Sequence, residues 1–67
     1  MLQLSLNGEK LHLTHICNLT ALLKQQGYQM QKIATAINGQ FVPRSLYDEI
    51  RVSDGDQIDV IQAIGGG

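Results

Sequence analysis

The chain ends in a strand-like stretch that leads into three glycines, Gln57-Ile58-Asp59-Val60-Ile61-Gln62-Ala63-Ile64-Gly65-Gly66-Gly67. Ile58 and Val60 alternate with polar residues, and this period of two predicts a strand with one buried face. The preceding segment, Asp54-Gly55-Asp56, has the composition of a turn. We therefore predict a final strand from Gln57 to about Ala63 that leads directly into a glycine arm.

Two hairpins are predicted upstream of this strand. In the first, leucines alternate with polar residues over 2–6 and 10–14, and the dipeptide Asn7-Gly8 between them favours the positive φ angles of a tight turn. The second has the same parts in the same order: a strand over 33–37, the turn Asn38-Gly39 and a short strand at Phe41-Val42. Pro43 ends this short strand, because proline has no N–H to donate to a sheet.

One helix is predicted between the hairpins. Asn18 is a candidate N-cap, since its short side chain can accept a hydrogen bond from the first free N–H groups of a helix. Three leucines then recur at helical spacing, at positions 19, 22 and 23. Gly27 suits the left-handed position that follows a helix. We expect the helix to run from about Asn18 to Gln26 and to pack its leucines on the sheet.

The order of elements predicts an α+β fold. A helical turn is expected over Ser45–Glu49, with Leu46 and Ile50 pointing inward. A helix that crosses between two hairpins suggests a mixed sheet of about four to five strands with the helix on one face. Taken with the terminal glycines, this order predicts a β-grasp (ubiquitin-like) domain over residues 1–64, with the first and last strands as parallel neighbours, and a flexible tail at 65–67.

Composition excludes several classes of protein. At 67 residues and 7.4 kDa the chain makes one small domain. Five Lys and Arg residues against six Asp and Glu leave no basic stripe for nucleic acid. No apolar run approaches the roughly 18–20 residues of a membrane span, and the N-terminus lacks the pattern of a signal peptide. We expect a protein of the reducing cytoplasm.

Metal and thiol chemistry are not indicated. Cys17 is the single cysteine, so the chain can form no internal disulfide and no multi-cysteine zinc cluster. We interpret it as a small buried hydrophobe just before the helix. His12 and His15 have no Cys or carboxylate at ligand spacing, and we predict no metal site.

The terminal glycines are the most informative feature for function. They are a frayed end, a cloning scar, or a slim arm that offers its α-carboxylate to another protein. Glycine has no Cβ, so such an arm can enter a narrow channel, and from Ile64 to Gly67 it spans about 13 Å at roughly 3.3 Å per residue. The ionised carboxylate is a poor acyl donor. The chain has no glycine-rich phosphate loop of its own, so activation requires a separate ATP-using enzyme.

Three segments together resemble the family of sulfur carrier proteins of thiamine biosynthesis (ThiS): Ala36-Ile37-Asn38-Gly39-Gln40-Phe41-Val42-Pro43-Arg44, Asp54-Gly55-Asp56-Gln57-Ile58-Asp59-Val60-Ile61 and Gly66-Gly67. The resemblance implies that a ThiF-like enzyme uses ATP to adenylate the carboxylate of Gly67. Sulfur from a cysteine desulfurase or another persulfide donor then gives a thiocarboxylate, which is delivered to thiazole synthase. Gly66 is the penultimate glycine of the motif, and Gly65 lengthens the arm. The chain itself binds no cofactor and is no enzyme.

A docking surface beside the arm is also predicted. If Ile58 and Val60 face the core, then Ile61 and Ala63 lie on the other face of the strand. In one interpretation, a β-bulge or a second core contact buries these two side chains. In the other, they stay exposed and form an apolar patch that binds a partner. Phe41 and Arg44, in the matched segment, are further candidates for partner contact.

Other functions share the same fold and tail. Within the same chemistry they are the small subunit of molybdopterin synthase and a ubiquitin-like modifier conjugated to lysines. An alternative from a different class of function is a β-grasp binding module with a passive tail. An enzyme with its own active site is the least expected, because the sequence shows no nucleophile–base pair.

Overall fold

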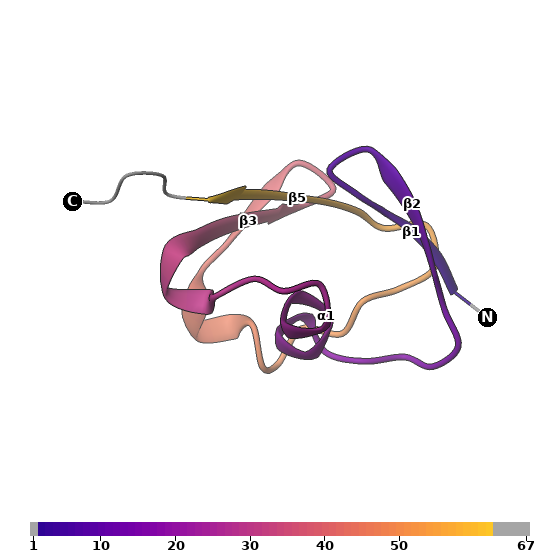
Figure 1. The fold of residues 1–67 in the computed structure, drawn as a ribbon, viewed down its shortest axis with the longest axis horizontal. Coiled ribbons are helices and arrows are strands. Elements are labelled where there is room, and N and C mark those ends of the chain that lie inside the picture. The colour runs from indigo at the N-terminus through magenta and orange to yellow at the C-terminus, as the bar shows by residue number, and fades with distance from the viewer. Residues whose placement is uncertain (1, 63–67) are drawn as a thin grey trace.

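A mixed five-stranded sheet carries the fold in the computed structural model, which describes residues 2–62 (Figure 1). The strands lie in the order β2-β1-β5-β3-β4. The first and last strands are therefore central neighbours, and they run parallel as predicted. The elements are β1 (Leu2–Leu6), β2 (Glu9–Leu13), α1 (Leu19–Gln25), η1 (Met30–Lys32), β3 (Ile33–Ile37), β4 (Gln40–Val42), η2 (Arg44–Leu46) and β5 (Gln57–Gln62).

Both predicted hairpin turns form, and both hold β5. Asn7 and Asn38 each adopt φ of 52°, followed by a glycine at positive φ, which is the backbone of a tight two-residue turn. The Oδ1 atom of Asn7 accepts a hydrogen bond from the backbone N–H of Val60 at 2.7 Å. The Oδ1 atom of Asn38 accepts one from the N–H of Gln57 at 2.9 Å. The two turns thus fix β5 from its two sides.

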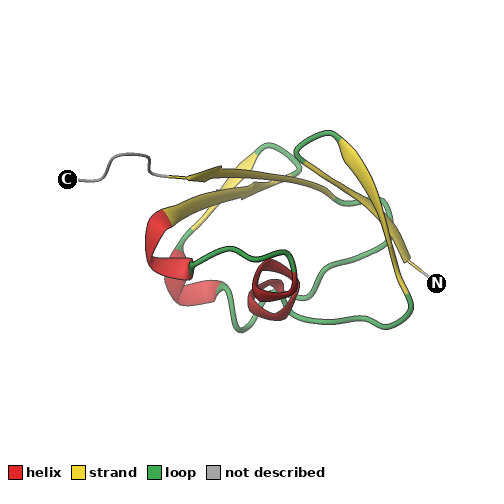
Figure 2. Ribbon diagram, viewed as in Figure 1, coloured by secondary structure: helices red, strands yellow, loops and turns green. Residues whose placement is uncertain are grey.

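The helix forms where the leucine spacing places it. Asn18 is the N-cap, and its Oδ1 accepts a hydrogen bond from the N–H of Ala21 at 2.8 Å. Gly27 follows the helix at φ of 90°, as expected for a residue that ends one. Leu19, Leu22 and Leu23 have no exposed surface. Figure 2 shows α1 lying on one side of the sheet, so the core fills the space between them.

One prediction about the core is wrong. Leu46 is 39% exposed instead of pointing inward, and Tyr47 is buried in its place. The helical turn begins earlier than predicted, as a 3₁₀ segment over Arg44–Leu46, and this shift turns the next side chain toward the core. The hydroxyl of Tyr47 donates to Oγ1 of buried Thr35 at 2.9 Å, which satisfies both polar groups. Ile50 packs partly buried against the core, as predicted.

The final strand ends at Gln62 in the part of the chain that the structure describes. The expected end of the strand at Ala63 and the division between domain and tail after residue 64 lie outside the described residues. Within residues 2–62, no helix has the length and apolar character needed to cross a membrane.

Candidate functional site

The end of β5 extends beyond its neighbour β1. The parallel pairing of β5 with β1 covers Gln57 and Ile58, whereas its antiparallel pairing with β3 continues to Gln62. Figure 1 shows the last part of β5 reaching past the hairpin of β1 and β2. Gln62, the last described residue of β5, therefore lies at one end of the molecule, with β3 as its flanking strand there.

Apolar side chains lie on the open face of the sheet near this end. Ile61 is 72% exposed and Phe41 is 69% exposed. Ala34 pairs with Ile61 across β3 and β5, and Ala36 pairs with Phe41 across β3 and β4. Their neighbours along the strands, Ile33, Thr35, Ile58 and Val60, are buried on the face toward α1. Side chains alternate between the two faces of a sheet, so the residues of the two pairs lie on the opposite face. We call Ala34, Ala36, Phe41 and Ile61 the outer-face patch.

The structure decides whether a β-bulge or a second core contact buries Ile61. Burial alternates regularly along β5 as far as Val60, and the register with β3 is continuous from Ile58 to Gln62, so no bulge reorients the strand. Ile61 makes no second core contact that would bury it. Half-buried Asp59 lies on the same face of the sheet, opposite Ala36. Of the alternatives for Ile61, the structure therefore shows the exposed one, and its contact with a partner stays a prediction.

A shallow hollow of about 300 Å³ lies beside the strand end. Lys32 and Arg44 line it together with Ile61 and Gln62. Arg44 is exposed, and its Nη2 donates a hydrogen bond to the carbonyl oxygen of Gln31 at 3.2 Å. The structure thus brings two predicted contact residues, Ile61 and Arg44, to one hollow, with Phe41 on the adjoining face.

Some of the predicted site residues cannot be placed. Gly65, Gly66 and Gly67, which carry the proposed chemistry, lie outside the described residues, as does Ala63. Sequence reasoning also missed the second cation of the hollow, Lys32. It precedes the strand that pairs with the final strand, and that pairing is the signal that could have identified it.

The thiol and imidazole groups lie together but form no metal-binding cluster. Cys17 is partly buried and packs against the core. His12 and His15 line a hollow with it, and Nδ1 of His15 lies 2.9 Å from the hydroxyl of Thr14. Among residues 2–62, no group of three or more His, Cys, Asp or Glu side chains is arranged to hold a metal ion.

Comparison with known proteins places the chain in a family. The family model described as the ThiS family matches residues 4–67, which is nearly the whole chain. The chain belongs to the ThiS family. The sulfur carrier protein ThiS of Escherichia coli is 46% identical over 46 residues, which cover 69% of this chain and 70% of that protein.

A solved relative has the same fold as this ThiS-family chain. The crystal structure of the thiamine biosynthesis protein ThiS from Geobacter metallireducens superposes with a TM-score of 0.83 at 28% identity. The match covers 98% of this chain and all of the Geobacter chain. The predicted β-grasp fold and the predicted family are confirmed. Family membership also confirms that the chain is a carrier and not itself a catalyst.

A third relative is a much longer protein. The thiazole synthase of Paramagnetospirillum magneticum is 35% identical over 66 residues. The match covers 98% of this ThiS-family chain but spans only 20% of the length of that synthase.

Proposed function

We propose that this ThiS-family chain carries sulfur as a thiocarboxylate on Gly67 for the synthesis of the thiazole part of thiamine. The observation that carries the proposal is the family match, which runs through the terminal glycines to residue 67. The names of two relatives support it, a sulfur carrier protein in Escherichia coli and a thiamine biosynthesis protein in Geobacter metallireducens.

The proposed chemistry has three steps. A carboxylate oxygen of Gly67 attacks the α-phosphorus of ATP on a ThiF-like adenylating enzyme, and pyrophosphate leaves. The terminal sulfur of a protein persulfide, supplied by a cysteine desulfurase or another donor, attacks the acyl carbon, and AMP leaves. A thiol then cleaves the sulfur–sulfur bond of the acyl disulfide, so the thiol and the donor end as a disulfide and Gly67 ends as a thiocarboxylate. ATP is thus used by the partner enzyme, and this chain supplies only the acyl group.

The proposed acceptor of the sulfur is thiazole synthase. The thiazole synthases of Paramagnetospirillum magneticum and Magnetococcus marinus contain a segment similar to 98% of this chain, at 35% and 33% identity. A carrier segment and a synthase within one polypeptide support a functional link between the two. Because the steps require ATP and free thiols, we place the reaction in the reducing cytoplasm.

The outer-face patch is the proposed docking surface for these enzymes. Residues 63–67 follow β5, and chain geometry limits their span to roughly 16 Å at about 3.3 Å per residue. An enzyme whose active site receives Gly67 must therefore cover the end of β5. Ile61 is exposed there, and Phe41 is exposed on the same face at the level of Ala36 and Asp59. Ala63 and Arg44 complete the proposed contact.

Growth of a strain that lacks this chain tests the proposal. We expect the strain to require thiamine and to grow when the thiazole alcohol is supplied instead. The full chain should restore growth, and a variant without Gly66 and Gly67 should not. If the shortened variant restores growth as well as the full chain, the terminal glycines are passive and the chain is a binding module. If the thiazole alcohol does not replace thiamine, the sulfur serves another pathway, such as molybdopterin synthesis.

A further inference from the structure

Two cations flank the end of β5. Lys32 directly precedes Ile33, and Ile33 is the β3 residue that pairs with Gln62. Arg44 lines the same hollow from the segment that follows β4. Its Nη2 atom donates a hydrogen bond to the neutral backbone carbonyl of Gln31, which orients the guanidinium without neutralising its charge. None of the described residues that line this hollow is acidic.

Three of the six acidic side chains accept hydrogen bonds elsewhere in the fold, whereas half-buried Asp59 lies on the outer face, opposite Ala36. A carboxylate oxygen of Asp54 accepts from the N–H of Gln3 at 2.8 Å, and the carboxylate of Asp56 accepts from the N–H of Ser53 and from Nδ2 of Asn38. These two acids precede Gln57, so they lie at the opposite end of β5 from Gln62. Asp48, which lines the next hollow with Arg44, accepts a hydrogen bond from the hydroxyl of Thr20.

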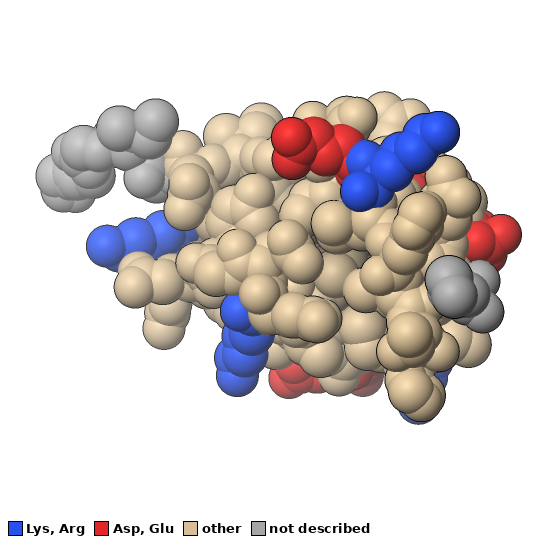
Figure 3. Space-filling view, turned by 45° about the vertical axis from the view of Figure 1, so that its right-hand side comes forward, with Lys and Arg blue, Asp and Glu red and all other residues tan. Residues whose placement is uncertain are grey.

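The charge distribution is therefore uneven although the chain has a formal net charge of −1. Figure 3 shows basic side chains at the end of the molecule where β5 ends, and both acidic and basic side chains over its middle and its opposite end. A protein that binds at the end of β5 thus meets a local positive field next to exposed apolar side chains. Charges at the border of an apolar contact raise the association rate and set its orientation, while the apolar centre gives most of the affinity.

We infer that Lys32 and Arg44 form a basic rim that steers this chain onto an acidic protein surface around the channel that receives Gly67. This inference rests on the proposed function and adds the chemistry of the partner, which is the ThiF-like adenylating enzyme. The apolar part of the partner surface covers Ile61, and its carboxylates face the two cations. The basic rim acts on the encounter and not on the chemical step, because neither cation belongs to the terminal glycines that react.

Charge reversal of the basic rim tests the inference. The double variant Lys32→Glu/Arg44→Glu is assayed in the full chain by the carrier-dependent exchange of pyrophosphate into ATP on the ThiF-like enzyme. Steering changes association rates by roughly 10- to 1,000-fold. At an ionic strength of about 0.01 M we expect the KM for the carrier to rise at least about tenfold, with kcat at saturating carrier unchanged. At about 1 M, where the Debye length is near 3 Å, the difference should fall to within about twofold.

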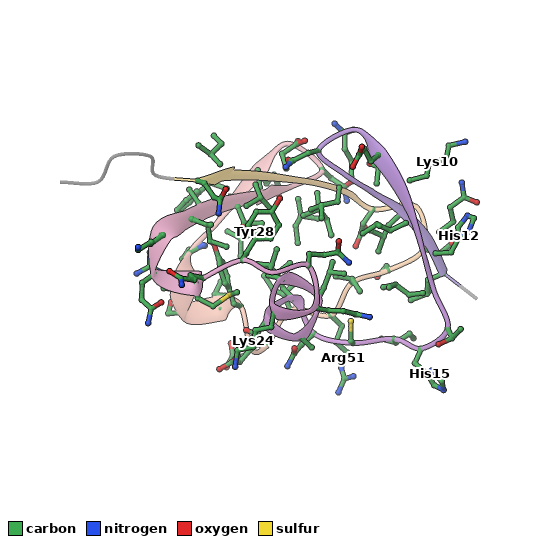
Figure 4. All side chains as sticks on the ribbon, in the orientation of Figure 1. Lys10, His12, His15, Lys24, Tyr28 and Arg51 are labelled. Carbon is green, nitrogen blue, oxygen red and sulfur yellow. The ribbon has the colours of Figure 1, made fainter. Side chains whose placement is uncertain are left out.

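The matched control is Lys10→Glu/Arg51→Glu. Each Lys or Arg to Glu change lowers the net charge by 2, so both double variants go from −1 to −5. Figure 4 shows Lys10 and Arg51 away from the end of the molecule where β5 ends, and both are exposed. The control should change KM by less than about twofold at either ionic strength. Equal effects of the two double variants would show that total charge acts and would overturn the inference.

A neutral pair of substitutions separates charge from folding. Lys32→Gln/Arg44→Gln should fold like the original chain, as judged by its thermal unfolding midpoint, and should raise KM less than the Glu pair. If the KM is unchanged for both rim variants while the original chain still gains sulfur, the inference about the basic rim is wrong and the proposed function stands. If the original chain supports no exchange and gains no sulfur, the proposed function fails, and the inference fails with it.

Discussion

At the scale of single residues, the two turn asparagines link the hairpins to β5, the strand that precedes the terminal glycines. Each tolerates φ of 52°, which costs most L-residues roughly 1–2 kcal/mol, and each uses its side chain to accept an N–H of β5. Their neighbours Gly8 and Gly39 complete the turns. The position of β5 therefore depends on side-chain hydrogen bonds as well as on strand pairing.

Replacement of Asn38 tests this role. Asn38→Ala should lower the free energy of unfolding by about 1–3 kcal/mol, because alanine resists positive φ and leaves the N–H of Gln57 without its 2.9 Å acceptor. Asn38→Gly is the matched control, since glycine accepts the backbone angle but also removes the acceptor. It should cost less than alanine. Urea unfolding measures both, and equal losses would show that backbone angle plays no part.

The buried pair of Tyr47 and Thr35 gives a second prediction. Tyr47→Phe should destabilise the fold by about 0.5–1.5 kcal/mol, because Oγ1 of buried Thr35 loses its partner. The double variant Tyr47→Phe/Thr35→Val should recover much of this loss, since it removes both polar groups together. Thermal unfolding of the original chain, the two single variants Tyr47→Phe and Thr35→Val, and the double variant measures the coupling. Additive effects of the two substitutions would contradict the paired role.

At the scale of elements, the N-cap of α1 is a local contribution that can be measured alone. Asn18→Ala should lower the free energy of unfolding by about 1 kcal/mol, because the N–H of Ala21 loses its acceptor at 2.8 Å. Asn18→Ser, which keeps a capping oxygen, is the control and should cost clearly less. Denaturant unfolding provides the comparison, and an equal cost for alanine and serine would mean that the cap is not responsible.

The open face of β5 predicts a functional effect without a loss of stability. Ile61→Asp should fold normally, because the side chain is 72% exposed, yet it should raise the KM for the carrier in the adenylation assay. Ile16→Asp is the matched control, since Ile16 is 60% exposed and belongs neither to the outer-face patch nor to the hollow beside it. An Ile61→Asp chain that accepts sulfur with unchanged KM would remove the outer-face patch from the docking surface.

Elements with a local chemical signal could be predicted from the sequence. The two Asn-Gly turns, the Asn18 cap and the alternation of Ile58 and Val60 each specify a backbone through neighbouring residues. The sequence predicted Leu46 in the core where Tyr47 is buried, because a single helical turn has too few residues to define a period. Lys32 carries no periodic signal at all. Its inferred role depends on the pairing of β3 with β5, which is a contact between residues far apart in the sequence.

At the scale of the whole molecule, the fold separates support from chemistry. The core between α1 and the sheet holds β5 as a central strand, with neighbours on both sides over its first part. Its far end is free of β1 and is bordered by the outer-face patch and the basic rim. In this arrangement a partner can cover the strand end and receive Gly67 without disturbing the core.

Intact-mass spectrometry tests the central claim most directly. The full chain is incubated with the ThiF-like enzyme, ATP, a cysteine desulfurase, cysteine and a thiol, and the same mixture without ATP is the control. We predict a mass gain equal to one exchange of oxygen for sulfur, located at Gly67 by fragmentation and absent without ATP. An unchanged mass in the complete mixture, or sulfur found at Cys17 instead of Gly67, would contradict the account.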